Sequence, residues 1–230
     1  MHILFTRPEI DSIYLAKKFI QQGHQVSIFP VLNIIKKKII DINFSNYTSV
    51  VFTSSNSILC LDQNIQSNIR CFCVGEATAE QAKIKGFTNI VVAGGNYLQL
   101  KEIILNMTDK NEGKFLYIRG EDIAHNFEGD LKKNGYQVDS VMNYTTYLNP
   151  DFDEKTLSIF QNQSIDLVFV YSKRSSEHLV KLIFNNNLES SCSLIRLRCL
   201  SENVLFPLKK IIWKNVKRDN TSAGSVDTKR

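Results

Sequence analysis

The sequence lacks the marks of several large classes of protein. It has no run of the roughly 20 apolar residues that a membrane-spanning helix needs. The five cysteines contain no C-x-x-C, and the four histidines show no metal-ligand spacing with them. Walker A and G-x-G-x-x-G motifs are absent, which disfavours a nucleotide or dinucleotide site. The absence of G-x-S-x-G likewise disfavours a serine hydrolase.

The remaining composition is that of an ordinary globular protein. The chain has 230 residues, 43% of them hydrophobic and 22% charged, which suits one large domain or two smaller ones. An odd number of cysteines predicts buried thiols in a reducing compartment. The chain enters a strand-like pattern directly after Met1, so we expect no secretory leader, no membrane partner and a cytoplasmic location.

The charge balance is modestly basic. A net charge of +5 suits an anionic ligand. The densest cluster, Lys36-Lys37-Lys38, is either a solvated connector or a phosphate contact. Aromatic and basic residues are not interleaved, so no nucleic-acid partner is expected.

An internal repeat is the strongest structural signal in the chain. Residues 114–147 read as strand, helix and strand, with Phe127 and Leu131 on one helical face and Asn134-Gly135 as the helix stop. The strand is predicted to end at Arg119-Gly120. The segment "LAKKFIQQGHQVSIFP" near the N-terminus aligns with "FEGDLKKNGYQVDSVM" without a gap. "SVVFTSSNSILCL" matches "DLVFVYSKRSSEHLV", and "RCFCVGEATAEQAKIKGFTNI" matches "RLRCLSENVLFPLKKIIWKNV".

This alternation of strands and helices predicts an α/β fold with parallel sheets. The order of the repeats predicts a discontinuous outer domain, residues 1–32 and 149–217, that holds an inserted domain, residues 38–145. Two extended crossings, residues 29–38 and 141–148, form a two-stranded ladder between the domains. Residues 218–230 have too few apolar side chains to order and are predicted to be disordered.

Small polar or glycine-containing turns follow the predicted strands. Ligands of open parallel sheets bind outside the carboxyl ends of strands, close to helix N-termini. The candidate ligand-binding residues there are Arg7, Thr53, Ser54, Gly75, Thr78, Arg119, Gly120, Ser172 and Ser201. A Ser or Thr before a helix is also an ordinary cap, and an arginine is also an ordinary surface charge. Taken together, the turns predict an anion-binding cleft that faces both domains and uses no metal or cofactor.

A set of segments in this order resembles the uroporphyrinogen-III synthase family: "ILFTRP", "VVFTSSNSI", "CVGEATAEQAKIKGF", "YIRGEDI", "LKKNGYQVDSVMNYTTY" and "LVFVYSKRSSEHL". The resemblance spans residues 3–216. It implies two α/β domains, a monomeric cytoplasmic enzyme of heme biosynthesis, and no cofactor. It implies hydroxymethylbilane, a linear tetrapyrrole with eight carboxylates, as the substrate. The ring closes with inversion of the last pyrrole and loss of water, giving uroporphyrinogen III.

The resemblance also implies roles for single residues. Tyr144 stands at the family's tyrosine in the second crossing, where it would protonate the departing hydroxyl; its alternative role is to pack between the domains. Thr78 and Ser172 match a threonine and a serine of the family. Ser201-Glu202-Asn203 departs from the family's glycine and threonine. Lys214-Asn215-Val216 is predicted to start one more strand, after which the chain becomes a polar tail, so the outer domain is expected to lack the family's last helix.

Two other functions stay open. A two-domain anion-binding module without catalysis would keep the same cleft. A nucleotide-sugar transferase of similar build would need a diphosphate site, and the sequence has no acidic metal-binding pair placed for one.

Overall fold

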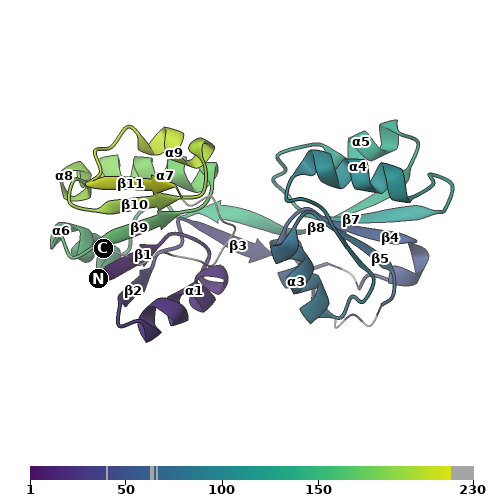
Figure 1. Ribbon diagram of the computed structural model, residues 1–230, viewed down its shortest axis with the longest axis horizontal. Helices are drawn as coiled ribbons and strands as arrows, with labels where there is room; N and C mark the ends of the chain where they lie inside the picture. Colours follow the sequence, from purple (N-terminus) through teal and green to yellow (C-terminus); the bar gives the residue numbers. More distant parts are fainter. Residues whose placement is uncertain (40, 63–64, 66, 219–230) are drawn as a thin grey trace. The chain divides into compact units, whose positions relative to one another are not determined.

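The structure, a computed structural model, describes residues 1–39, 41–62, 65 and 67–218. The chain divides into two compact units (Figure 1). Unit 1 comprises Met1–Asn33 and Tyr147–Arg230, and unit 2 comprises Ile34–Thr146. No helix in the described ranges is long and apolar enough to cross a membrane.

Unit 1 is built on a five-stranded sheet with helices on both faces. The strands lie in the order β11 (Asn215–Arg218), β10 (Arg196–Cys199), β9 (Leu167–Val170), β1 (His2–Phe5) and β2 (Gln25–Ile28). One face packs Ile3 and Phe5 against α1 (Glu9–Gln21). The other is covered by α6 (Glu154–Gln161), α7 (Lys173–Asn185), α8 (Glu189–Cys192) and α9 (Glu202–Leu208).

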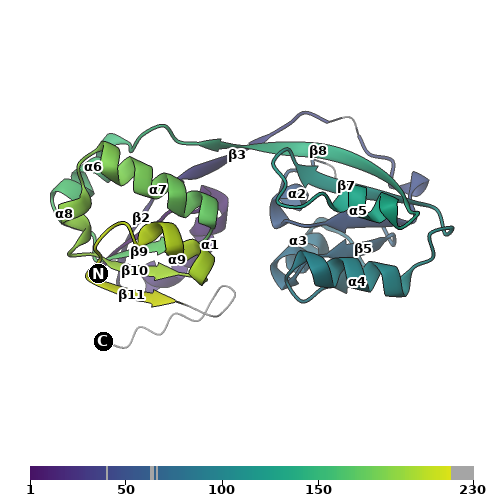
Figure 2. The ribbon, with the colours of Figure 1, turned by 90° about the horizontal axis from the view of Figure 1, so that it is seen from above.

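Unit 2 is built on a six-stranded sheet. Its order is β3 (Leu32–Lys36), β8 (Gln137–Leu148), β7 (Lys114–Gly120), β4 (Ser49–Phe52), β5 (Arg70–Cys73) and β6 (Ile90–Val92). The helices α2 (Ser55–Leu59) and α3 (Glu76–Lys85) cover one face, and α4 (Tyr97–Met107) and α5 (Phe127–Lys133) cover the other (Figure 2). A 3-10 turn spans Phe44–Asn46.

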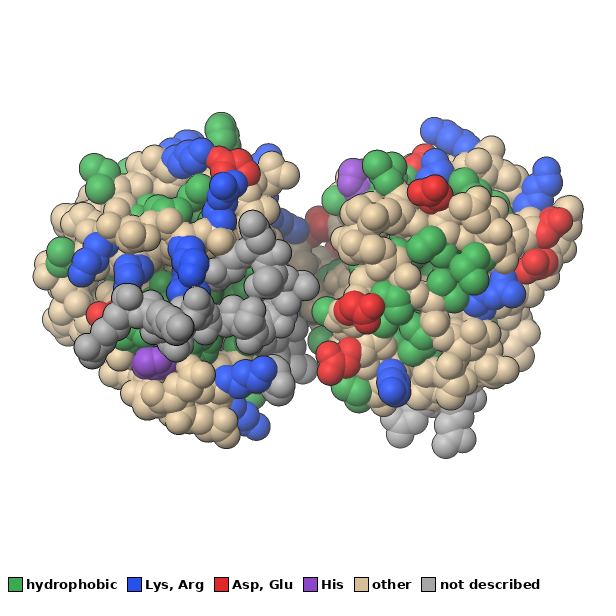
Figure 3. Space-filling view, in the orientation of Figure 1, with side chains coloured by type: hydrophobic (Ala, Val, Ile, Leu, Met, Phe, Trp, Pro, Cys, Tyr) green, Lys and Arg blue, Asp and Glu red, His purple; other side chains and the backbone are tan. Residues whose placement is uncertain are grey.

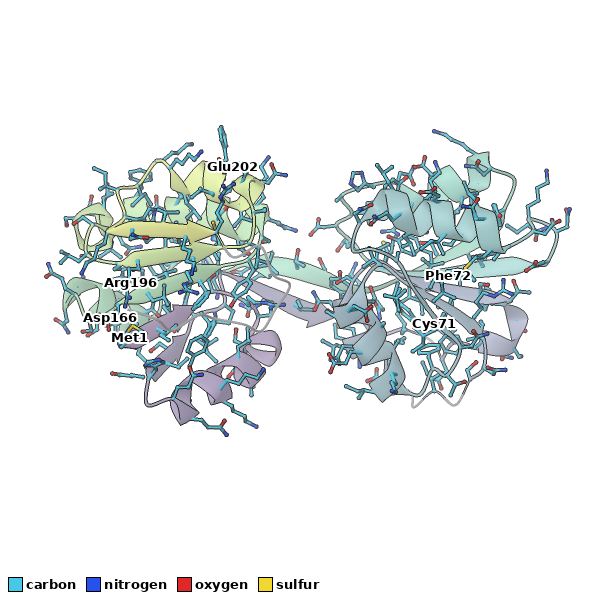
Figure 4. The ribbon with its side chains drawn as sticks, in the orientation of Figure 1. Met1, Cys71, Phe72, Asp166, Arg196 and Glu202 are labelled. Carbon is cyan, nitrogen blue, oxygen red and sulfur yellow. The ribbon has the colours of Figure 1, made fainter. Side chains whose placement is uncertain are left out.

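Alternation along the strands divides the core of unit 2 into two layers. Cys71 and Phe72, both labelled in Figure 4, are neighbours in β5 and pack in different apolar clusters. Cys73 shares the cluster of Cys71, and both thiols are fully buried, as their spacing predicts. Successive side chains of a strand point to opposite faces, so one apolar strand supplies both layers.

The chain passes between the units on β3 and β8, which are neighbours in the sheet. The amide of Asn149 donates to Val31 O at 3.1 Å, and the amide of Lys37 donates to Asn143 O at 2.9 Å. From the first of these hydrogen bonds to the second, the residue number rises from 31 to 37 on one strand and falls from 149 to 143 on the other. The two strands therefore run antiparallel. Every strand pair within the two sheets whose register is given is parallel.

The α/β fold class with parallel sheets is therefore confirmed. The domain boundaries drawn from the repeats stay predictions about independently folding domains. The strand predicted over residues 115–118, with a break at Arg119-Gly120, is longer than predicted: β7 includes both of these residues, and Gly120 pairs with Tyr144 after a register shift. Such an irregularity lets pairing continue past a turn-like sequence.

Three other details differ from the sequence prediction. The helix expected from Glu177 begins at Lys173, because Ser172 accepts a hydrogen bond from the amide of Ser175 and caps it earlier. The short helix α8 was not expected. Arg218, assigned to the tail, pairs with Cys199 at the end of β11. The rest of the predicted tail, residues 219–230, lies outside the described residues.

Candidate functional site

A cavity of about 290 Å³ lies at the carboxyl ends of the central strands of unit 2. Five of the candidate residues line it: Thr53, Ser54, Arg119, Gly120 and Tyr144. They come from β7, β8 and the turn that follows β4. This edge of the sheet is where ligands of parallel α/β folds bind. The strand ends thus bring together residues that lie far apart in the sequence.

Tyr144 stands in the wall of this cavity with 8% of its surface exposed. Burial raises the pKa of its phenol, and the nearby hydroxyls of Ser54 and Ser57 partly oppose that effect. A Cβ on Gly120 would come within 2.6 Å of the tyrosine ring, so only glycine leaves room for it. Tyr144 therefore keeps its proton near neutral pH and can serve as a donor.

The surroundings of Tyr144 are polar although they are buried. Asn143 and Ser57 are both fully buried, and Asn143 Nδ2 donates to Ser57 O at 2.6 Å. Within the described structure, Asn143 Oδ1 and Ser57 Oγ have no partner at hydrogen-bond distance. The effect of Ser57 on the pKa of Tyr144 therefore reflects proximity rather than a full hydrogen bond. An unsatisfied buried polar atom costs about 1–3 kcal/mol, so the fold alone does not favour these groups.

A second hydroxyl pair lies in the same wall. Thr53 Oγ1 and the Tyr117 hydroxyl are 2.9 Å apart, and Tyr117 is only 2% exposed. Burial raises the pKa of Tyr117, while the bond to Thr53 and the charge of Arg119 lower it. Tyr117 was not among the residues predicted for the site, because in the sequence it is part of an apolar strand. The feature of the sequence that could have identified it is a tyrosine, with its polar hydroxyl, inside an otherwise apolar strand.

Arg119 is held in place by three hydrogen bonds. Its Nε donates to Ser140 Oγ at 3.0 Å, and its Nη1 donates to Gly120 O at 2.9 Å and to Glu121 O at 3.4 Å. The guanidinium lines the cavity with its orientation set by the neighbouring strand. Ser140 was also missed, and no sequence motif marked it.

Aromatic rings complete the wall. The rings of Tyr97 and His125 stack with centroids 4.5 Å apart, and Tyr97 meets Phe127 edge-on at 5.6 Å. All three residues line the cavity. Flat apolar rings beside a cation and several hydroxyls suit a flat aromatic ligand that carries acidic groups. From the sequence, His125 was considered only as a metal ligand, so this arrangement was missed.

Two candidates of unit 2 lie outside the lining. Gly75 precedes α3, and a Cβ placed there would approach within 3.2 Å of Gly95, which does line the cavity. Thr78 is 4% exposed within α3, and its amide donates to Gly75 O. The binding roles of both residues stay predictions.

The remaining candidates belong to unit 1. The Arg7 guanidinium lies 4.6 Å from the centre of the Tyr171 ring. Ser172 caps α7 and donates to Ser175 Oγ at 2.8 Å, whereas Ser201 precedes α9 without a side-chain cap bond. The prediction that these residues share one groove with those of unit 2 stays a prediction.

Surface charge differs between the visible faces of the units. In Figure 3, Lys and Arg side chains predominate on that of unit 1, and both signs appear on that of unit 2. Lys36 pairs with Asp62, and Lys37 Nζ lies 2.9 Å from a Glu121 carboxylate oxygen. Ion pairs of this kind favour the interpretation of the lysine cluster as a solvated connector.

Comparisons with known proteins agree with this architecture. The family model described as uroporphyrinogen-III synthase HemD matches residues 14–220. A protein of Methanocaldococcus jannaschii, provisionally named a uroporphyrinogen-III synthase, is 29% identical over 90 residues, which cover 36% of this chain and 38% of that protein. The chain is thus matched to little more than a third of the length of that relative.

Two solved structures share the fold. The uroporphyrinogen-III synthetase of Helicobacter pylori superposes with a TM-score of 0.59 at 12% identity, covering 94% of this chain and 92% of that one. A mutant uroporphyrinogen III synthase of the extremely thermophilic bacterium Thermus thermophilus gives 0.53 at 13% identity, covering 96% and 94%. Because the family model matches nearly the whole chain, the chain belongs to the uroporphyrinogen-III synthase family.

Proposed function

We propose that this chain is a uroporphyrinogen-III synthase of heme biosynthesis. It would close hydroxymethylbilane into uroporphyrinogen III with inversion of the last pyrrole and loss of one water. Membership of the family supports the reaction class. The observation that carries the proposal for this chain is the buried Tyr144 phenol, which stands in a cavity wall that Ser54 and Arg119 also line.

Tyr144 is proposed as the proton donor. It protonates the hydroxyl of the hydroxymethyl group, which leaves as water and gives an azafulvene. Burial keeps the phenol protonated until the hydroxyl approaches. The proton is recovered when the last pyrrole loses its own proton as the ring closes, so water is the only net product besides the macrocycle. Help from a general acid of this kind is typically worth about 10²–10⁴-fold in rate.

Positioning is proposed to supply the rest of the rate enhancement. The azafulvene can also close without inversion, so the enzyme must hold the flexible chain in the shape that leads to a spiro intermediate. Arg119 offers a fixed charge to a carboxylate, and Tyr97 and His125 offer a flat surface to a pyrrole. Restricting the reacting atoms in this way lowers the barrier without a strong acid or base.

The proposal also covers the remaining binding residues, the oligomeric state, the cofactor requirement and the location of the protein. Gly75, Thr78 and the unit 1 residues Arg7, Ser172 and Ser201 are proposed to bind further carboxylates. The protein is proposed to act as a cytoplasmic monomer with no cofactor. All five cysteines are free and buried, which supports a reducing compartment.

One assay tests the reaction directly. The purified chain is incubated with freshly generated hydroxymethylbilane, the products are oxidised to porphyrins, and the isomers are separated. We expect the inverted isomer III to predominate, whereas buffer alone gives the uninverted isomer I. A product ratio equal to that of buffer would contradict the proposal and favour an anion-binding module without catalysis.

A further inference from the structure

We propose that Tyr117 is a positioning residue that orients the Thr53 hydroxyl toward a ligand carboxylate held by Arg119. The inference rests on the proposed function and adds to it a residue that no motif marked. It assigns to this wall of the cavity a subsite for one carboxylate of the ligand.

The contact itself gives the first argument. Tyr117 lies in β7, Thr53 directly follows the adjacent strand β4, and their oxygens are 2.9 Å apart. A phenol is far more acidic than an aliphatic alcohol, so Tyr117 is the better donor of the two. With Tyr117 donating, the Thr53 hydroxyl keeps its own proton for an acceptor in the cavity that Thr53 lines. The positive Arg119 beside Tyr117 favours an anionic acceptor there.

The internal repeat gives the second argument, because it provides a natural control within the molecule. Phe5 pairs with Ile28 and Phe169 in unit 1, and Tyr117 pairs with Ser140 and Val51 in unit 2. The sequence echo aligns Phe5 with Tyr117 and Ile28 with Ser140 without a gap.

Unit 1 thus builds the same sheet with apolar side chains at both positions. Phe5 is fully buried and stacks on Phe169 at 5.1 Å. The parallel sheet therefore does not need a hydroxyl at Tyr117 or at Ser140. In unit 2, both hydroxyls make contacts that orient cavity-lining residues, Thr53 and Arg119.

The test compares two buried tyrosine–threonine pairs. The matched control is Tyr136, which is 6% exposed, shares the apolar cluster of Tyr117, and donates to Thr108 O at 2.9 Å outside the cavity lining. Tyr117→Phe and Tyr136→Phe each remove one phenol hydroxyl from the same core. Uroporphyrin III, an octacarboxylic porphyrin, serves as the binding probe, with its fluorescence titrated against each variant. KM and kcat for hydroxymethylbilane are measured in parallel.

We expect Tyr117→Phe to raise KM and the uroporphyrin Kd about three- to tenfold, as the loss of one oriented hydrogen bond predicts, with kcat nearly unchanged. Thr53→Val should have the same effect, and the double variant should add little to it, because the two hydroxyls act together. Tyr136→Phe should leave both constants at the parent values. If Tyr117→Phe fails to fold, the KM and uroporphyrin Kd of Thr53→Val test whether the Thr53 hydroxyl binds the ligand.

Unchanged constants in Tyr117→Phe, or equal changes in Tyr117→Phe and Tyr136→Phe, would overturn the proposal. Additive effects of the Tyr117 and Thr53 variants would also overturn it. A parent chain that binds uroporphyrin but makes no inverted isomer refutes the proposed function, and the Kd series still decides the role of Tyr117. A parent chain that does neither refutes both.

Discussion

The end of β4 in unit 2 and the end of β9 in unit 1 are equivalent by strand pairing, yet their side chains have different partners. Val51 corresponds to Phe169, so Thr53 corresponds to Tyr171. Thr53 bonds to the Tyr117 hydroxyl in a cavity wall. Tyr171 instead stacks with Phe169 at 6.0 Å and lies beneath the Arg7 guanidinium.

The next residue shows what the two units share. Ser54 and Ser172 each follow their strand and cap the helix that comes next. A cap satisfies free amides of the first helical turn in both units, so the fold explains it. Ser54 also lies close enough to the Tyr144 phenol to lower its pKa, and both residues line the cavity. The comparison separates polar groups that the fold requires from those that it does not.

Among the variants that test the cavity of unit 2, Gly120→Ala should lose the most synthase activity. The new Cβ would lie 2.6 Å from Cζ of Tyr144, so the ring must move. We expect at least about a 100-fold loss of synthase activity, because displacing a reacting group by about an ångström has that effect. Gly86→Ala is the control: its φ of +104° makes alanine strained, which costs about 1 kcal/mol, but it lies outside the cavity lining. Equal activity losses in both variants would contradict the expectation.

Tyr144→Phe keeps the ring and removes only the donor. We expect about a 100-fold slower turnover, at the low end for a general acid because water can partly substitute. Released intermediate then closes spontaneously, so the proportion of the uninverted isomer should rise. Isomer analysis and thermal melting check both points, with Tyr47→Phe as the control, since its hydroxyl bonds to Asp139 away from the cavity lining. A Phe variant with parental rate and product would make Tyr144 a packing residue.

Arg119→Ala and Arg7→Ala probe the charges at equivalent strand ends. Arg119 lines the cavity, so its loss should raise KM about tenfold, as expected for a hydrogen bond to a charged group. Arg7 lies over the Tyr171 ring, and we expect a smaller rise from its loss. Arg119→Lys should fall between, because lysine keeps the charge but lacks the forked donor geometry. Initial-rate measurements decide the order, and a larger effect at Arg7 would reverse the assignment.

Phe5→Tyr places the unit 2 phenol in unit 1. In unit 2 this phenol hydrogen-bonds to Thr53, whereas the equivalent position in unit 1 is Tyr171. The new buried hydroxyl would therefore lack that partner, and we expect it to lower the free energy of unfolding by about 1–3 kcal/mol. Urea denaturation measures the loss. Tyr117→Phe should change stability by less, because its partner Thr53 faces a cavity where a ligand or water can bond to it. A neutral Phe5→Tyr would show that unit 1 also accommodates the hydroxyl.

The smallest expected effect is in the alkaline titration of the phenols. Burial raises the pKa values of Tyr117 and Tyr144 above the ordinary value near 10. The unfolded chain therefore loses these protons first, and the stability they contribute is present below about pH 10 and lost as the pH rises further. Absorbance at 295 nm should show phenols that titrate late. Burial and the hydrogen bond to Asp139 also raise the pKa of Tyr47, so one late phenol should remain in the Tyr117→Phe, Tyr144→Phe double variant. An unchanged number of late-titrating phenols in that variant would contradict the assignment.

The sequence predicted the fold well because its signals are local and repeated. Apolar strand runs such as residues 115–118, and helix stops such as Asn134-Gly135, need no partner in order to be recognised. Errors occurred where a distant contact overrides the local pattern. β7 continues through Arg119 because β8 pairs with it, although Arg-Gly alone resembles a turn.

The candidate site was predicted less completely. The strand-end rule located Thr53, Ser54 and Gly120, and the family resemblance singled out Tyr144. Tyr117 was missed because a tyrosine inside an apolar run is indistinguishable from a core residue until the partner of its hydroxyl is known. No pattern in the sequence around Ser140 indicates that Arg119 would bond to it.

The sequence by itself determined the α/β class, the parallel strands and the repeat, because hydrophobic period and turn chemistry act over a few residues. Tertiary structure decided which strand ends enclose a cavity and which hydroxyls face each other there. Thr53 and Tyr117 lie 64 residues apart, and only sheet order and register bring their oxygens to 2.9 Å. Register is a long-range property, since one residue of slip would move a side chain to the other face of the sheet.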